Sequence, residues 1–142
     1  MNDYPARVTV CRQVEWQDTD AAGHYHHSTV IRWVESAETV LHERLGLTEL
    51  MAILPRVRYE VDYLARLYYR DEVEVAVGVS GIGETSARFA FEVTRVADDL
   101  LAARGQFVVV HIERASAGKV PWPAPVRTAL LTAGAQAPER LA

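Results

Sequence analysis

Two aspartates and three histidines lie within ten residues of one another near the start of the chain, where residues 18–27 read D-T-D-A-A-G-H-Y-H-H. An amphipathic segment begins directly after them, at Ser28. The first turn of a helix offers unpaired backbone N–H groups and a partial positive charge. A carboxylate beside such a helix end could attack a carbonyl group, or activate water, while the N–H groups polarise the carbonyl oxygen. We therefore expect the chemistry of the protein in this stretch.

The same side chains are also potential ligands for zinc or iron, which bind histidine nitrogens and carboxylate oxygens. Five such groups in ten residues do not all converge on one ion, and no second cluster in the sequence supplies a distant ligand. The sequence contains no P-loop, no G-x-G-x-x-G and no G-x-S-x-G motif. We therefore expect no metal site and no cofactor, and neither a serine hydrolase nor a dinucleotide enzyme.

Length and composition are those of one ordinary globular domain, with 142 residues of which 49% are hydrophobic and 24% charged. The net charge of −4 argues against a nucleic-acid partner. The single cysteine excludes an intramolecular disulfide. The first residues lack the pattern of a signal peptide, and no apolar run reaches the roughly 18 residues that a spanning helix needs. We expect a cytoplasmic protein with no membrane span.

Hydrophobic periodicity predicts a strand, a long helix and then four more strands. Valines near alternate positions predict the first strand over residues 7–16. Apolar residues three and four positions apart predict a helix that Ser28 caps and Gly46 ends, with Ile31 on its apolar face. From residue 57 the period becomes two, and strands are expected near 57–63, 73–79, 87–94 and 101–114. A short helix over about 124–133 and a frayed tail are expected to follow.

This order of elements predicts an α+β domain in which an antiparallel five-stranded sheet wraps around one long central helix. We expect a single domain over residues 1–142, with its core at about 7–115 and a C-terminal extension at 116–142. The last long strand is apolar on both faces over residues 107–110. Such a strand is expected to be covered twice, by the helix on one side and by a second subunit on the other.

Together, this order and the 18–27 loop resemble the hotdog-fold acyl-CoA thioesterases, in particular the 4-hydroxybenzoyl-CoA thioesterase class and its tol-pal-associated, YbgC-like branch. Residues 32–38, R-W-V-E-S-A-E, and 63–75, Y-L-A-R-L-Y-Y-R-D-E-V-E-V, resemble the family's helix and next strands. The resemblance covers roughly residues 7–115. It implies an enzyme that hydrolyses an acyl- or aryl-CoA to the free acid and CoA. It also implies a homodimer or homotetramer with its sites at a subunit interface.

The resemblance assigns the catalytic carboxylate to Asp20, as a nucleophile or a general base. It assigns the backbone N–H that holds the thioester carbonyl to His27, whose side chain also matches a histidine of the YbgC-like branch. Gly23 is expected to let the loop approach closely. We interpret Asp18 as a loop-shaping residue and Glu35 as structural.

Substrate contacts follow from the resemblance less directly. The loop histidines His24 and His26 are expected at the pocket, and His26 replaces an aromatic residue that is common in the family. The 4-hydroxybenzoyl-type enzyme has a basic cluster between its third and fourth strands for the nucleotide phosphates. The corresponding turn here, S-G-I-G-E-T-S, has no basic residue. We therefore expect the CoA nucleotide at Arg66, Arg70 or Arg88.

Two other functions remain open on the same fold. One is a thioesterase that acts on an acyl carrier protein or a polyketide-type substrate. The other is a non-catalytic protein that binds acyl chains or acyl-CoA. A hotdog dehydratase is disfavoured by the D-x-D-x-x-G loop. We expect Trp33, Tyr63 and Phe107 in the core or an interface, and His111 as a core or interface histidine with one hydrogen bond.

Overall fold

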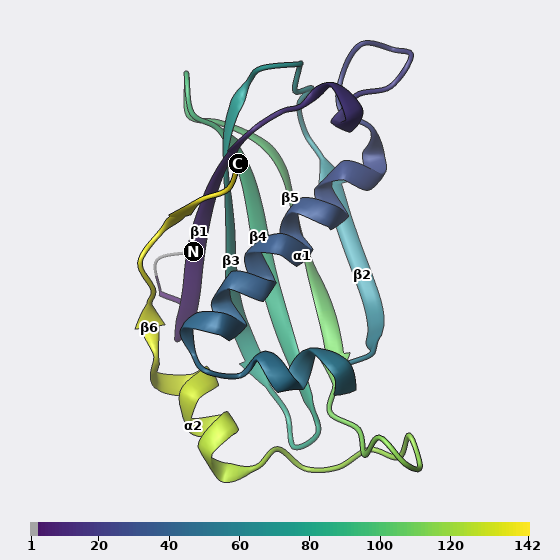
Figure 1. The fold of residues 1–142 in the computed structure, drawn as a ribbon, viewed down its shortest axis with the longest axis vertical. Helices are drawn as coiled ribbons and strands as arrows, with labels where there is room; N and C mark the ends of the chain where they lie inside the picture. The colour runs from purple at the N-terminus through teal and green to yellow at the C-terminus, as the bar shows by residue number, and fades with distance from the viewer. Residues whose placement is uncertain (1–2) are drawn as a thin grey trace.

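One long helix lies across one face of a curved antiparallel sheet in the computed structural model, which describes residues 3–142 (Figure 1). The main strands pair in the order β2-β5-β4-β3-β1. This confirms the predicted α+β architecture. The large elements are β1 (Ala6–Gln13), α1 (His27–Arg44), β2 (Arg56–Tyr63), β3 (Glu72–Ile82), β4 (Ser86–Arg95) and β5 (Leu100–Val110). The short ones are η1 (Trp16–Asp18), η2 (Thr48–Ile53), α2 (Ala124–Thr132), β6 (Gly134–Ala135) and β7 (Glu139–Arg140).

The core forms where the apolar face of α1 meets the concave face of the sheet. Val30, Val34, Ala37 and Leu41 are fully buried, as their helical spacing predicts. Ile31 was also expected on this face, but it is partly exposed. It lies about 100° around the helix from Val30, at the margin of the buried arc. Among the described residues, no helix is long and apolar enough to cross a membrane.

The N-terminus of α1 differs from the prediction by one residue and by its cap. The helix begins at His27, and His26 is the N-cap residue in place of Ser28. The His26 ring nitrogen Nδ1 accepts the Ser28 backbone N–H at 3.1 Å and lies 2.8 Å from the Ser28 hydroxyl. An imidazole nitrogen thus takes the capping role expected of a serine oxygen. Gly46, at φ +71°, follows the helix C-terminus as predicted.

The ends of two strands are also corrected. The first strand stops at Gln13, three residues early, because the chain turns into η1. The strand expected to reach about residue 114 stops at Val110, because the chain beyond it folds back on itself and Ile112 pairs with Lys119.

The C-terminal tail is docked on the sheet, which corrects the expectation of a frayed end. The helix α2 forms as predicted, and β6 and β7 then run parallel to β1. The Gln136 N–H donates to the Arg7 carbonyl at 2.8 Å, and the Leu141 N–H donates to the Cys11 carbonyl at 2.9 Å. These bonds satisfy backbone groups that β1 would otherwise leave open at the sheet edge. The sheet therefore has seven strands in the described residues, and β2, at its other edge, pairs only with β5.

Candidate active site

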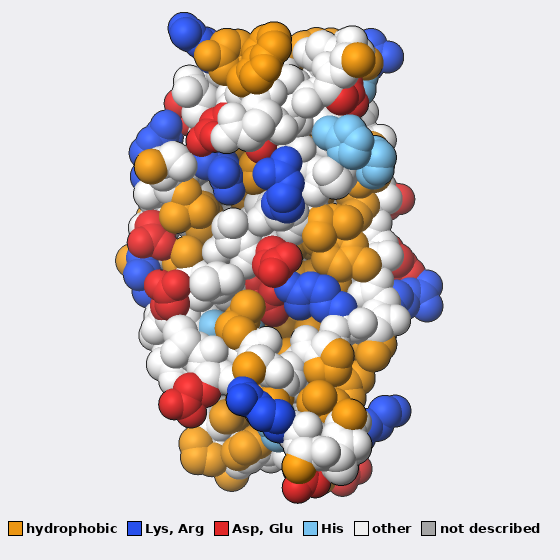
Figure 2. All heavy atoms as spheres, turned by 45° about the vertical axis from the view of Figure 1, so that its right-hand side comes forward, with side chains coloured by type: hydrophobic (Ala, Val, Ile, Leu, Met, Phe, Trp, Pro, Cys, Tyr) orange, Lys and Arg blue, Asp and Glu red, His pale blue; other side chains and the backbone are white. Residues whose placement is uncertain are grey.

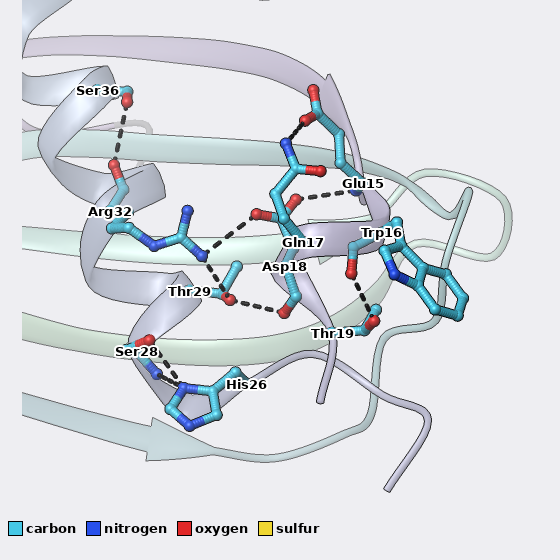
Figure 3. Close-up of polar contacts among 10 residues, drawn as sticks. All are labelled: Glu15, Trp16, Gln17, Asp18, Thr19, His26, Ser28, Thr29, Arg32 and Ser36. Carbon is cyan, nitrogen blue, oxygen red and sulfur yellow. Dashed lines mark hydrogen bonds and ion pairs between the residues drawn. The ribbon is translucent and has the colours of Figure 1, made fainter. Parts of the chain in front are cut away.

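Asp18 fixes the loop between η1 and α1 (Figure 3). Its buried carboxylate accepts the Glu15 N–H at 2.9 Å and lies 3.3 Å from the guanidinium of Arg32. Its carbonyl oxygen accepts the His26 N–H and the Thr29 hydroxyl, each at 2.8 Å. The residue thereby ties the loop to the first turn of α1. These contacts support the interpretation of Asp18 as a loop-shaping residue.

A tight turn presents Asp20 beside the helix. Its Oδ1 accepts the Ala22 N–H at 2.8 Å, and its carbonyl accepts the Gly23 N–H at 2.9 Å. Gly23 has φ +88°, a conformation that side chains with a Cβ atom rarely adopt, as expected for this position. Among the described residues, Oδ2 of Asp20 has no hydrogen-bond partner. One carboxylate oxygen therefore orients the side chain and the other is available to a ligand.

Asp20 lines a pocket of about 360 Å³ between the loop, the start of α1 and the end of β2. This volume lies within the range of small-molecule sites. Of the residues predicted from the sequence, the pocket brings together Asp20, His27, His24 and Arg66. The other lining residues are Tyr25, Tyr63, Leu64 and Ala65.

The backbone N–H of His27 is an unpaired donor at this pocket. His27 is the first residue of α1, and within residues 3–142 its N–H has no acceptor. The next two N–H groups, of Ser28 and Thr29, are both taken by His26, through its ring nitrogen and its carbonyl. A residue with a free donor, at the positively polarised end of a helix, therefore lines the pocket beside Asp20.

Two tyrosines that were not predicted as site residues line the pocket. Tyr63, expected in the core or an interface, is 46% exposed, and its hydroxyl donates to the His27 carbonyl at 2.7 Å. Tyr25 is buried, and its hydroxyl donates to the carbonyls of Ala65 and Ala102. Burial, with a smaller contribution from Tyr63, raises the pKa of Tyr25 to about 12, so this phenol is a neutral donor. The sequence signals available were the position of Tyr25 within the 18–27 loop and the alternation of β2, which ends at Tyr63.

Three predicted contact residues lie outside the pocket lining. His26 caps α1. Arg70 lies in the turn before β3, and its guanidinium is 5.3 Å from the centroid of the Tyr69 ring. Arg88 is exposed on β4 and borders a separate hollow at the turn between β3 and β4. Of the three candidate arginines, Arg66 alone shares the pocket with Asp20.

A buried ionic cluster lies further along α1, and it was not predicted. Glu38 and His42, one turn apart, are both fully buried, with 3.3 Å between Glu38 Oε2 and His42 Nε2. Arg56 of β2 pairs with the same carboxylate. Burial acts to raise the pKa of Glu38, but hydrogen bonds from His42 and Arg56 outweigh it and hold this pKa below the usual value. The cluster therefore joins α1 to β2 as an ion pair.

Glu35, interpreted as structural, is exposed on α1, and its role stays a prediction. His111 is buried, with one hydrogen bond from its Nδ1 to the Val120 carbonyl at 2.9 Å. In the part of the chain that the structure describes, no three His, Cys, Asp or Glu side chains are grouped to hold a metal ion.

Residues 14–130 match the model of the thioesterase-like superfamily. The chain belongs to this superfamily. The match includes the Asp20 loop, α1 and the strands β2 to β5, and it confirms the expected hotdog fold and class of enzyme, a thioester hydrolase. No curated protein sequence matches the chain.

Solved structures agree with this membership. A thioesterase from Thermus thermophilus, crystallised with coenzyme A and Zn, is 30% identical with a TM-score of 0.78, over 92% of this chain and 94% of that one. A predicted thioesterase from Bacillus stearothermophilus is 27% identical with a TM-score of 0.79, over 88% and 94%. A 1,4-dihydroxy-2-naphthoyl-CoA thioesterase from Synechocystis, 24% identical, shares the fold with a TM-score of 0.81 over 87% and 95%.

Proposed function

We propose that the protein hydrolyses the thioester of an acyl- or aryl-CoA to the free acid and CoA in the Asp20 pocket. The observation that carries this proposal is that Asp20 and His27, whose backbone N–H is unpaired in the described chain, line the same pocket. The two groups are what thioester hydrolysis requires, a nucleophile or base and a donor for the developing oxyanion. The relative crystallised with coenzyme A supports CoA as the carrier of the acyl group.

In the reaction, the thioester carbonyl oxygen accepts the His27 N–H and lies at the positive end of α1. Two routes lead from there. Asp20 attacks the carbonyl carbon, the C–S bond breaks and CoA leaves as a thiolate, and water then hydrolyses the mixed anhydride and restores the carboxylate. Alternatively, Asp20 takes a proton from a water molecule that attacks the same carbon, the C–S bond breaks, and the proton passes from Asp20 to the departing CoA thiolate.

The neighbouring residues position these two groups. The hydroxyl of Tyr63 donates to the His27 carbonyl and so holds the peptide that follows the donor N–H. Asp18 and Gly23 determine the path of the loop that carries Asp20. A positioning role of this kind matters because small displacements of reacting groups lower rates strongly.

We also propose that the working enzyme is at least a homodimer formed through β2. This strand lies at an edge of the sheet with one neighbour, and Val57 and Tyr63 on it are exposed. A second copy paired there would cover them and enclose the pocket, which lies at the end of the same strand.

The test is release of free thiol from a panel of short, long and aryl acyl-CoAs, comparing wild type with Asp20→Asn. We expect wild type to hydrolyse part of the panel and Asp20→Asn to lose about 10²-fold or more in kcat/KM. Asp99→Asn is the matched control, because Asp99 is an exposed turn residue at φ +56°, which asparagine adopts as easily.

Each contrary result has a definite meaning. Robust turnover by Asp20→Asn would refute the assignment of Asp20. Absence of turnover on every CoA ester, with turnover on an acyl carrier protein, would identify the carrier protein as the donor. Saturable acyl-CoA binding without thiol release would favour a non-catalytic binding protein.

A further inference from the structure

An exposed aromatic patch lies at the end of the molecule that also carries the Asp20 loop. It consists of Trp16 in η1, which is 75% exposed, and of Tyr68 and Tyr69 from the connection between β2 and β3, each nearly half exposed. The rings of Trp16 and Tyr69 meet edge to face, with centroids 5.9 Å apart. Figure 2 shows hydrophobic side chains on this end, with basic groups on either side. Clustered exposed aromatic groups beside a pocket mark a binding surface.

Two arginines connect this aromatic patch with the pocket. The guanidinium of Arg70 lies over the ring of Tyr69, and Arg66, four residues earlier, lines the pocket itself. Arg70 has φ +74°, a conformation that residues with a Cβ atom rarely adopt and that glycine would take without strain. Strained residues of this kind concentrate at ligand-binding positions. Positive charge therefore extends from the pocket to the aromatic groups.

The two segments that form the aromatic patch are held together by their backbones. The Val14 N–H donates to the Asp71 carbonyl at 2.8 Å, and the Arg70 N–H donates to the Val14 carbonyl at 2.9 Å. The Tyr25 N–H donates to the carbonyl of Leu67, a fully buried residue, at 2.8 Å. These bonds set the aromatic patch at a fixed position relative to the pocket, as a preorganised subsite requires.

On the basis of the function proposed above, we propose that the aromatic patch binds the adenosine 3′,5′-bisphosphate end of CoA. The adenine base stacks on the exposed ring of Trp16, and the phosphates meet Arg70, whose guanidinium lies over Tyr69. Aromatic rings bind any nucleobase through its π-face, and guanidinium groups bind phosphate oxygens through paired hydrogen bonds. The pantetheine arm separates the thioester from the nucleotide, so a nucleotide subsite belongs on the surface outside the pocket, where this aromatic patch lies.

The first test measures binding of adenosine 3′,5′-bisphosphate, which is not hydrolysed, by isothermal titration calorimetry. We expect saturable binding to wild type, weakened about tenfold or more by Trp16→Ala and by Arg70→Gly. Glycine is chosen at position 70 because it suits the backbone there. Arg44→Ala, at the far end of α1, is the control and should bind as wild type does. Lack of binding to wild type, or unchanged affinity in both patch variants, would overturn the proposal.

The second test compares an acyl-CoA with the acyl-pantetheine thioester of the same acid, which lacks the nucleotide. We expect Trp16→Ala to raise KM for the acyl-CoA without changing kcat, and to leave both constants unchanged for the acyl-pantetheine. An equal loss on the two substrates would refute a nucleotide subsite. If the proposed hydrolysis itself fails, neither ester is cleaved, while the calorimetric result still decides whether the aromatic patch binds the nucleotide.

Discussion

Replacing Arg56 by alanine should destabilise the fold far more than its partly exposed position suggests. The variant leaves the carboxylate of Glu38, only 1% exposed, without its cation and with His42 as its one remaining partner. Removing one partner of a buried ion pair costs about 3–5 kcal/mol. Arg56 is itself 26% exposed, so water can enter in its place and we expect the lower end, about 3 kcal/mol. For a domain of this size, that corresponds to a fall in Tm of roughly 6–12 °C.

The assay is urea unfolding followed by circular dichroism, at one fixed protein concentration for all variants. Arg58→Ala is the matched control, because Arg58 lies on the same strand and pairs with Glu60 at the surface. Exposed pairs of this kind contribute about 0–1 kcal/mol. The double variant Glu38→Gln/Arg56→Ala should recover part of the loss, since no buried charge is left unpaired. Equal destabilisation by Arg56→Ala and Arg58→Ala would refute the reasoning.

The ion pair of Glu38 and Arg56 should also make the free energy of unfolding depend on pH in the acid range. The pKa of Glu38 is lowered in the folded state, because its hydrogen bonds to His42 and Arg56 outweigh the effect of burial. The ionised Glu38 therefore contributes fully to the free energy of unfolding above the ordinary carboxyl pKa of 4.5. This contribution is lost as the pH falls through the lower pKa that Glu38 has in the folded state. Repeating the urea curves from pH 7 to pH 3 should give a shallower acid decline for Glu38→Gln than for wild type, and parallel declines would contradict this assignment.

Three further predictions follow from the site and the tail. Asp18→Ala leaves the Glu15 N–H without its acceptor and Arg32 without its carboxylate partner, and should lower the free energy of unfolding by about 1–3 kcal/mol. It should also lower kcat more than it raises KM, and a wild-type kcat would argue against its positioning role. Deleting residues from Gly134 onward exposes the edge of β1 and should cause concentration-dependent aggregation in light scattering, whereas a monodisperse product would contradict it. Exhaustive chelation should leave thioesterase activity unchanged, and loss with recovery on adding Zn²⁺ would favour a metal site instead.

Local periodicity was enough to predict the main elements. The buried residues Val30 and Leu41 of α1 follow the helical spacing, and Val75 and Val77 of β3 follow the alternation of a strand. Gly46 ends the helix because a positive φ suits glycine, and this too is a local property. The stretch containing Asp20 was identified from residue types alone, and the structure places it at a pocket.

The features that were missed depend on contacts between distant segments. Glu38 and His42 fall within the buried arc of α1, but the partner that makes their burial possible, Arg56, comes from another strand. The pairing of the tail with β1 has no periodic pattern, because each of β6 and β7 is two residues long. Tyr63 reaches the pocket only because β2 ends beside the start of α1.

The covering of β1 by the tail also limits how copies of the chain can associate. With β6 and β7 in place, β2 is the one main strand of the described sheet with an open side. A sheet that is open at both edges can add copies without end and form a fibre, whereas a sheet open at one edge can be extended only once. The segment from Gly134 onward thus prevents polymerisation through β1. Edge-to-edge pairing of copies through β2 then stops at a dimer.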